Sequence, residues 1–176
     1  ASIVPTTRNL LLAKSLLLTA ALGLAACTNP NRFGGNDVNL GGANGAGLGS
    51  ASDPTSAAYF QQSVGDRVLF AVDQASLSPE TQAVLDSQTN WLNSNGAYTA
   101  IIEGHADEQG TREYNLALGA RRAQAVQDYL ISQGVSAARL KTISYGKERP
   151  IEVCSDESCY SRNRRAVTVL AAGLSG

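Results

Sequence analysis

The fold is decided by residues 98–134, which read YTAIIEGHADEQGTREYNLALGARRAQAVQDYLISQG. The stretch begins with strand formers over 98–103 and continues through a loop at 104–110. A long helix is then predicted from about Thr111 to Gln133, ended by Gly134. A strand, a loop and a helix in this order are typical of the repeating unit of an α/β domain.

Further strands and one more helix flank this unit. Three other runs are rich in strand formers, at 67–71, 140–145 and 166–170. A second helix is predicted from Pro79 to about Asn93, because Ser78 is a favourable N-cap and apolar residues follow at helical spacing. The expected order is β-α-β-α-β-β. We therefore expect an α/β (α+β) sandwich in which two helices pack on a mixed sheet.

Composition limits what this chain is expected to do. The 176 residues are 43% hydrophobic and 16% charged, which is enough apolar material for one ordinary domain with appendages. The net charge of −1 does not favour a nucleic acid as partner. One His and three Cys would all be consumed by a single tetrahedral zinc site, so a fold built on metal is not expected.

Residues 1–26 have the pattern of an export signal. Arg8 and Lys14 precede the apolar run SLLLTAALGLAA at 15–26, which is too short to span about 30 Å of hydrocarbon as a helix. The run ends in Leu24-Ala25-Ala26-Cys27 and resembles the lipobox of bacterial lipoproteins. That resemblance implies a mature chain that starts at a lipidated Cys27. The alternative is a buried amphipathic helix with an incidental Cys.

Residues 27–62 are rich in Gly and Asn and are predicted to form a flexible tether. With few large apolar side chains, such a segment does not offset its ordering entropy by burial. As a Gly-rich coil it would span on the order of 35 Å. A phosphate-binding loop is the alternative, but no Gly-Lys-Ser or Gly-Lys-Thr occurs here. The folded domain is accordingly expected at 63–176.

The long helix predicted from about Thr111 to Gln133 presents one stripe toward the sheet. At 100° per residue, the stripe comprises Leu116, Gly119, Ala120, Ala123, Val126 and Leu130. Asn115 and Arg122 lie together beside it, whereas Arg121 points nearly opposite, toward water. Helical side chains lean toward the N-terminus, so Arg122 is expected to reach the loop that carries Asp107. From spacing alone, the two charges either form a structural ion pair, are solvated, or hold a guest between them.

Several motifs resemble the C-terminal domain of the outer-membrane protein A (OmpA) family over about Arg67 to Val169. The motifs are Gly104-His105-Ala106-Asp107-Glu108-Gln109-Gly110-Thr111, Tyr114-Asn115, Ala117-Leu118-Gly119-Ala120-Arg121-Arg122-Ala123, Tyr145-Gly146-Lys147-Glu148-Arg149-Pro150 and Asn163-Arg164-Arg165-Ala166-Val167. One departure is Gly119, where the family commonly has Ser. The resemblance implies an OmpA-like domain that holds the peptide stem of peptidoglycan noncovalently through meso-diaminopimelate.

The same resemblance implies roles for individual residues. Asp107 would accept the ammonium of diaminopimelate, and Arg122 would hold its carboxylate with the planar fork that makes Arg suited to this group. Asn115 would make a polar contact, and Asp73 would lie in a loop that offers backbone hydrogen bonds. Arg164 is a weaker candidate that either contacts the ligand or supports the site.

The resemblance also implies a place in the cell envelope and a set of partners. These are peptidoglycan, the outer membrane through the lipid on Cys27, and the TolB-like periplasmic propeller protein of the Tol system. Thr28, rather than Asp, follows Cys27 and favours the periplasmic face of the outer membrane. Beyond the covalent lipid no cofactor is expected. The chain is expected not to be an enzyme.

A cell-wall hydrolase is the alternative function considered. His105, Asp107 and Glu108 could supply acid and base groups, but no nucleophile is paired with a base at a matching spacing. A lone His at a strand end is more often a packing residue, and Tyr114 is read in the same way.

Cys154 and Cys159 lie five positions apart in a loop before the last strand. An exported protein meets an oxidising compartment, so a disulfide within this loop is expected. Free thiols or a metal pair are the alternatives, and they lack further ligands nearby in the sequence.

Overall fold

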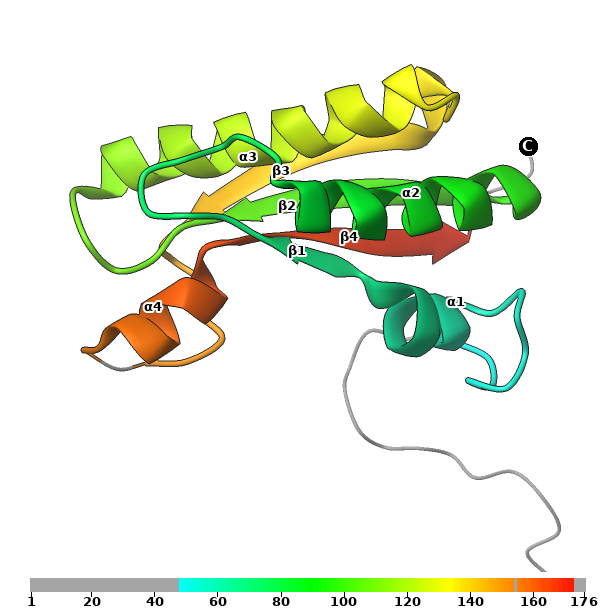
Figure 1. The fold of residues 1–176 in the computed structure, drawn as a ribbon, viewed down its shortest axis with the longest axis horizontal. Helices are drawn as coiled ribbons and strands as arrows, with labels where there is room; N and C mark the ends of the chain where they lie inside the picture. The colour runs from blue at the N-terminus through cyan, green and yellow to red at the C-terminus, as the bar shows by residue number, and fades with distance from the viewer. Residues whose placement is uncertain (1–47, 154, 173–176) are drawn as a thin grey trace, which may run out of the picture. The chain divides into compact units, whose positions relative to one another are not determined.

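The computed structural model describes residues 48–153 and 155–172. The predicted signal segment and Cys27 lie outside these residues. In chain order the elements are α1 (Ala57–Tyr59), the single π-helical turn η1 (Phe60–Gly65), β1 (Arg67–Leu69), α2 (Pro79–Ser94), β2 (Tyr98–His105), α3 (Arg112–Ser132), the short 3₁₀ turn η2 (Ala137–Arg139), β3 (Leu140–Gly146), α4 (Glu157–Asn163) and β4 (Arg165–Ala172). Figure 1 labels the α-helices and the strands. The predicted α/β class is confirmed, with α4 added between the last two strands.

The four strands form one mixed sheet in the order β1-β4-β2-β3. β2 and β3 run parallel, whereas β4 is antiparallel to both of its neighbours. Alternation along β2 separates the two faces, because Ile102 is fully buried and Ile101 is 38% exposed. α2 and α3 pack on the Ile102 face and supply Leu85, Leu92, Val126 and Leu130 to the core.

Both long helices begin where their capping residues predict. The Ser78 hydroxyl accepts a hydrogen bond from the Thr81 amide at 3.2 Å, and Pro79 follows in the first turn of α2. The Thr111 hydroxyl caps α3 in the same way, because it accepts a hydrogen bond from the Tyr114 amide. These caps place the start of α3 directly after the loop that carries Asp107.

The buried face of α3 is rotated from the predicted stripe. Leu116 is 42% exposed and Ala120 is also exposed, so their placement in the stripe is wrong. The buried residues are Asn115, Leu118, Gly119, Arg122, Ala123, Val126 and Leu130. The prediction failed because it counted only small and apolar residues, whereas two polar side chains belong to the buried face.

The packed domain starts earlier than residue 63, which corrects the end of the predicted tether. Ala57 and Ala58 are 7% exposed and Phe60 is fully buried. The Trp91 ring lies 4.9 Å from the Phe60 ring, and its Nε1–H donates to the Pro54 carbonyl at 2.7 Å. A short apolar run beside Gly-rich sequence gave too weak a signal to assign to the core.

Close contact between α3 and β2 depends on two facing glycines. A Cβ on Gly104 would lie 1.8 Å from the Gly119 carbonyl oxygen, and a Cβ on Gly119 would lie 2.8 Å from the Gly104 oxygen. The helix backbone therefore rests directly on the strand. This contact sets the distance between Arg122 and the end of β2.

Gly104→Ala is expected to lower the free energy of unfolding by about 1–3 kcal/mol or more, because the added methyl group pushes α3 away from the sheet. Gly96→Ala is the matched control, since a Cβ there meets no atom within 4 Å. Urea denaturation followed by circular dichroism measures both. Equal stability of the two variants would contradict the close-contact assignment.

Candidate functional site

A cavity of about 270 Å³ lies where the loops after β1 and β2 meet the first half of α3. These loops lie at one end of the sheet, the end that also carries α4 (Figure 1). The cavity is lined by Val72, Asp73, Asp107, Gln109, Gly110, Tyr114, Asn115, Leu118 and Arg122. Four of the five residues predicted as ligand-binding are thus brought together, and Arg164 is the one outside the lining.

Arg122 is fully buried and ties three backbone segments together. Its Nε–H donates to the Gln74 carbonyl at 2.8 Å, one Nη to the His105 carbonyl at 2.7 Å and the other to the Ala71 carbonyl at 3.1 Å. A guanidinium has five N–H groups. One N–H on each terminal nitrogen therefore has no acceptor within 48–153 and 155–172, and this side chain lines the cavity.

The Arg122 guanidinium keeps its charge at neutral pH despite its burial. Loss of solvent lowers the pKa of Arg122 to about 10, and the charge of Arg164 acts in the same direction. The carboxylates of Asp107 and Asp73 oppose that shift. A buried positive charge with two N–H groups unused by the described residues therefore belongs to the wall of the cavity.

Asp107 is only 8% exposed and is held by partners other than Arg122. Its Oδ2 accepts from Arg164 Nη1 at 3.0 Å, and its Oδ1 accepts from the Gln109 amide at 3.2 Å. Among the residues that the structure describes, no ion pair joins Asp107 to Arg122. The structural ion pair between these two residues, left open by the sequence, is not formed.

Arg164 lies behind Asp107, at the C-terminal cap of α4. Besides Asp107 it contacts the Glu157 carboxylate and the Phe70 carbonyl, the latter at 3.2 Å. The hydrogen bond to Glu157 raises the pKa of Arg164. Its position outside the cavity lining, with these contacts, supports the reading of Arg164 as a residue that orients Asp107. The sequence did not indicate Glu157, because α4 was assigned to a loop.

Asn115 and Asp73 shape the two loops at the cavity mouth. The Asn115 amide donates to the Gln109 carbonyl at 2.7 Å and so fixes the loop after β2. Asp73 adopts a φ of 56°, and its carboxylate accepts a hydrogen bond from the Tyr114 hydroxyl. Tyr114 is 44% exposed and lines the cavity, so its reading as a packing residue is wrong.

His105 is 1% exposed and is not part of the cavity lining, which agrees with its reading as a packing residue. Burial, aided by the positive charges of Arg165 and Arg149, lowers the pKa of His105 to about 3. Glu103 Oε2 lies 3.5 Å from His105 Nε2 without a hydrogen bond and does not reverse this shift. The imidazole is therefore neutral at physiological pH.

His105→Leu is expected to flatten the acid side of the stability curve. An unfolded His has a pKa of about 6.5, so below that pH the unfolded chain takes up a proton that the folded protein excludes. Stability is therefore full above about pH 6.5 and falls as the pH drops toward 3. Between pH 7 and pH 5 the wild-type chain should lose roughly 1–2 kcal/mol more than the variant in urea denaturation. Parallel losses would contradict a buried neutral imidazole.

The remaining sequence predictions meet the structure only in part. Cys159 is disulfide-bonded, whereas Cys154 lies outside the described residues, so the pairing of the two stays a prediction. Within the described residues, no group of three or more His, Cys, Asp and Glu side chains is arranged to hold a metal ion. In the same part of the chain, no helix has the length and apolar character needed to cross a membrane.

The profile of the OmpA family matches residues 69–164, and the chain belongs to that family. Within it, the chain is 50% identical over 165 residues to the peptidoglycan-associated lipoprotein of Mesorhizobium japonicum, with 94% of each chain covered. It is 53% identical to the peptidoglycan-associated lipoprotein of Agrobacterium fabrum, over 90% of this chain and 88% of that one. The resemblance inferred from the motifs around Asp107 and Arg122 is confirmed.

Solved structures agree with this assignment. The crystal structure of the peptidoglycan-associated lipoprotein from Burkholderia pseudomallei is 37% identical, has a TM-score of 0.61 and covers 69% of this chain and 98% of its own. The C-terminal domain of Helicobacter pylori MotB has a TM-score of 0.58 at 19% identity, over 62% of this chain and 86% of that one. The second likeness concerns the fold alone.

Proposed function

We propose that this chain is an outer-membrane lipoprotein whose domain binds the diaminopimelate-containing peptide stem of peptidoglycan noncovalently. The observation that carries the proposal is that Asp107 and Arg122 line one cavity and are not paired with each other. An ammonium and a carboxylate on a single carbon require an acid and a base held apart in this manner. The names of the relatives, which describe association with peptidoglycan, point in the same direction.

Binding would use the N–H groups of Arg122 and the lone pairs of Asp107 that form no hydrogen bond within the described residues. The two unused N–H groups of Arg122 can hold a carboxylate in two parallel hydrogen bonds. Asp107 has further lone pairs on both oxygens for an ammonium. A stem with lysine in place of diaminopimelate lacks the carboxylate and would leave the buried guanidinium unmatched, which costs affinity.

The proposed anchor is a lipid on Cys27, which places the domain at the periplasmic face of the outer membrane. Because the packed domain begins before residue 63, the linking segment is shorter than the sequence predicts. From Cys27 to Leu48 the chain spans at most about 75 Å when fully extended. This length limits how far from the membrane the wall can be held.

A role in the Tol-Pal system is the cellular part of the proposal. A TolB-like propeller protein would be the periplasmic partner and would compete for a surface that overlaps the cavity. This part rests on the family resemblance alone.

Hydrolysis by His105, Asp107 and Glu108 finds less support than binding. A general base must reach the proton that it removes. His105 is almost fully buried and outside the cavity lining, and one Glu108 oxygen is taken by the Asn163 amide at 2.9 Å. Asp107 alone of the three lines the cavity, and it is already ion-paired.

Asp107→Asn and Arg122→Lys should each weaken binding at least about tenfold, because the first removes the negative charge that faces the ammonium and the second removes the planar fork that holds the carboxylate. Calorimetric titration of the full-length chain with a diaminopimelate-containing muropeptide measures the effect. Arg121→Ala is the matched control, since Arg121 is exposed and outside the cavity.

Circular dichroism verifies that each variant folds. Asp107→Asn is the sharper test, because Arg122→Lys also removes bonds to backbone carbonyls. An equal loss in Arg121→Ala, or equal affinity of the wild-type chain for a lysine-containing stem, would refute the proposal. Appearance of a cleaved stem peptide would favour the hydrolase instead.

Cys27→Ser should move the protein from the membrane fraction to the soluble fraction and leave muropeptide affinity unchanged. The reason is that the acyl chains would be lost while the cavity is untouched. Fractionation followed by immunoblotting measures the distribution. A variant that stays with the membrane would show that something other than a lipid on Cys27 holds it.

A further inference from the structure

Among the residues that the structure describes, β1 forms one edge of the sheet and has β4 as its only strand neighbour. In the antiparallel ladder, Asp66 accepts from the Thr168 amide at 2.7 Å and the Phe70 amide donates to Arg164 at 2.9 Å. Alternate residues of an antiparallel strand face the same neighbour. The backbone groups of Arg67 and Leu69 therefore point away from β4.

Most of these outward groups are unpaired. The Leu69 carbonyl accepts from Thr81 Oγ1 at 3.2 Å. Among the described residues, no hydrogen bond is made by the Leu69 N–H or by the N–H and carbonyl of Arg67. An open row of donors and acceptors on an edge strand is a template for another extended chain.

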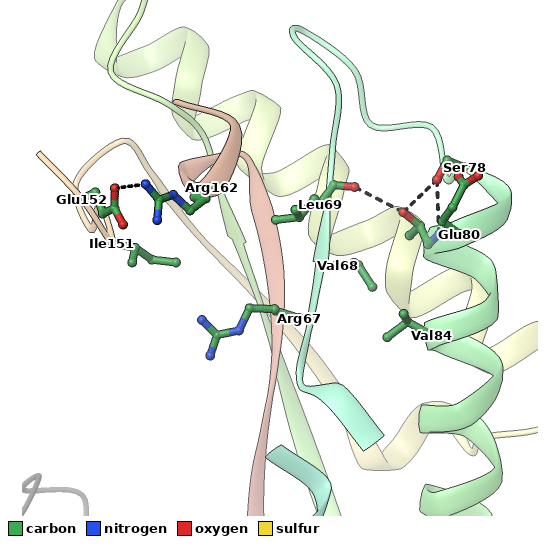
Figure 2. Close-up of a pocket in the computed structure, with 10 residues that line it drawn as sticks. Arg67, Val68, Leu69, Ser78, Glu80, Val84, Ile151, Glu152 and Arg162 are labelled. Atoms are coloured by element: carbon green, nitrogen blue, oxygen red, sulfur yellow. Dashed lines mark hydrogen bonds and ion pairs between the residues drawn. The ribbon is translucent and has the colours of Figure 1, made fainter. Parts of the chain in front are cut away.

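A groove of about 570 Å³ runs beside this edge. Its walls are the start of α2, around Ser78, and the segment near Ile151. In Figure 2, the Leu69 and Arg67 side chains point toward the Ile151 wall, whereas Val68 points toward α2. Leu69 is 50% exposed and Ile151 is 45% exposed, so the groove offers apolar surface that the domain leaves uncovered.

Both Arg side chains that line the groove already have a carboxylate partner. Arg67 bonds to Asp66, which lies outside the lining, at 2.8 Å. Arg162 pairs with Glu152 at 2.6 Å, as drawn in Figure 2. Glu80 is the remaining carboxylate, and the Ser78 hydroxyl, which bonds to it, lowers its pKa. The lining holds two Arg and two Glu side chains and has no net charge. An uncharged occupant therefore matches this surface better than an acidic or basic one.

We propose that the open edge of β1 is a strand-addition site for an extended, uncharged segment of a partner protein. Its backbone would pair with Arg67 and Leu69, and apolar side chains at alternate positions would cover Leu69 and Ile151. The groove has no lining residue in common with the cavity of Asp107 and Arg122. The proposal thus stands independently of peptidoglycan binding.

Amide hydrogen exchange, measured by NMR on the full-length chain, tests this directly. The probes are capped pentapeptides that alternate Thr with Val, Ile, Leu or Phe, each at millimolar concentration. At least one peptide should slow exchange of the Arg67 and Leu69 amides by about tenfold or more. The amides of Val68 and Phe70 already face β4 and should change little.

Two controls separate strand addition from simple apolar binding. Methylation of the peptide nitrogens that face β1 should abolish the protection, because it removes the donors to the edge. Leu69→Lys should also abolish it, whereas Ile101→Lys, a similar change on an exposed β2 residue outside the groove, should not.

Three results would overturn the proposal. The first is that no peptide protects the Arg67 and Leu69 amides. The second is that the N-methylated peptides protect them equally well. The third is that these amides are protected in the free protein and the chain sediments as a dimer, which would assign the edge to a second copy instead.

Discussion

The interaction on which the site depends is the hydrogen bonding of one buried guanidinium to three backbone carbonyls. Arg122 connects the loop after β1, through Ala71 and Gln74, to the end of β2 at His105. Hydrogen bonds from a charged donor contribute about 1.5–3 kcal/mol each, enough to offset much of the cost of burying the charge. Because these contacts hold both loops, the cavity between them exists before any guest arrives.

A second constraint keeps Asp107 and Arg122 from forming an ion pair with each other. Arg164 takes one oxygen of Asp107, and the carbonyls take three N–H groups of Arg122. Each charged side chain is stabilised by its own partners. A direct ion pair between Asp107 and Arg122, which would close the cavity, would therefore add little stability. The Glu157 carboxylate in turn accepts a hydrogen bond from Arg164. α4, which carries Glu157, therefore helps to position Asp107 although it does not line the cavity.

The sequence predicted the elements with strong local signals and missed those that depend on tertiary contacts. Ser78 with Pro79, and Thr111, marked the helix starts because capping is decided within one turn. Arg122 was found because helical spacing and the family motifs select the same position. Phe60 was missed because its burial depends on Trp91, which lies 4.9 Å away in space and far along the chain.

Preorganisation of this kind bears on the strength of the proposed interaction with peptidoglycan. A guest would find its loops already ordered, so little conformational entropy would be lost on binding. It would also find most donors of Arg122 and one lone pair on each oxygen of Asp107 already engaged, which leaves a few new hydrogen bonds to gain. Such a site favours selective but moderate binding by each domain. Many lipid-anchored copies holding one polymer would then provide a firm connection through their number, while each single contact stays reversible.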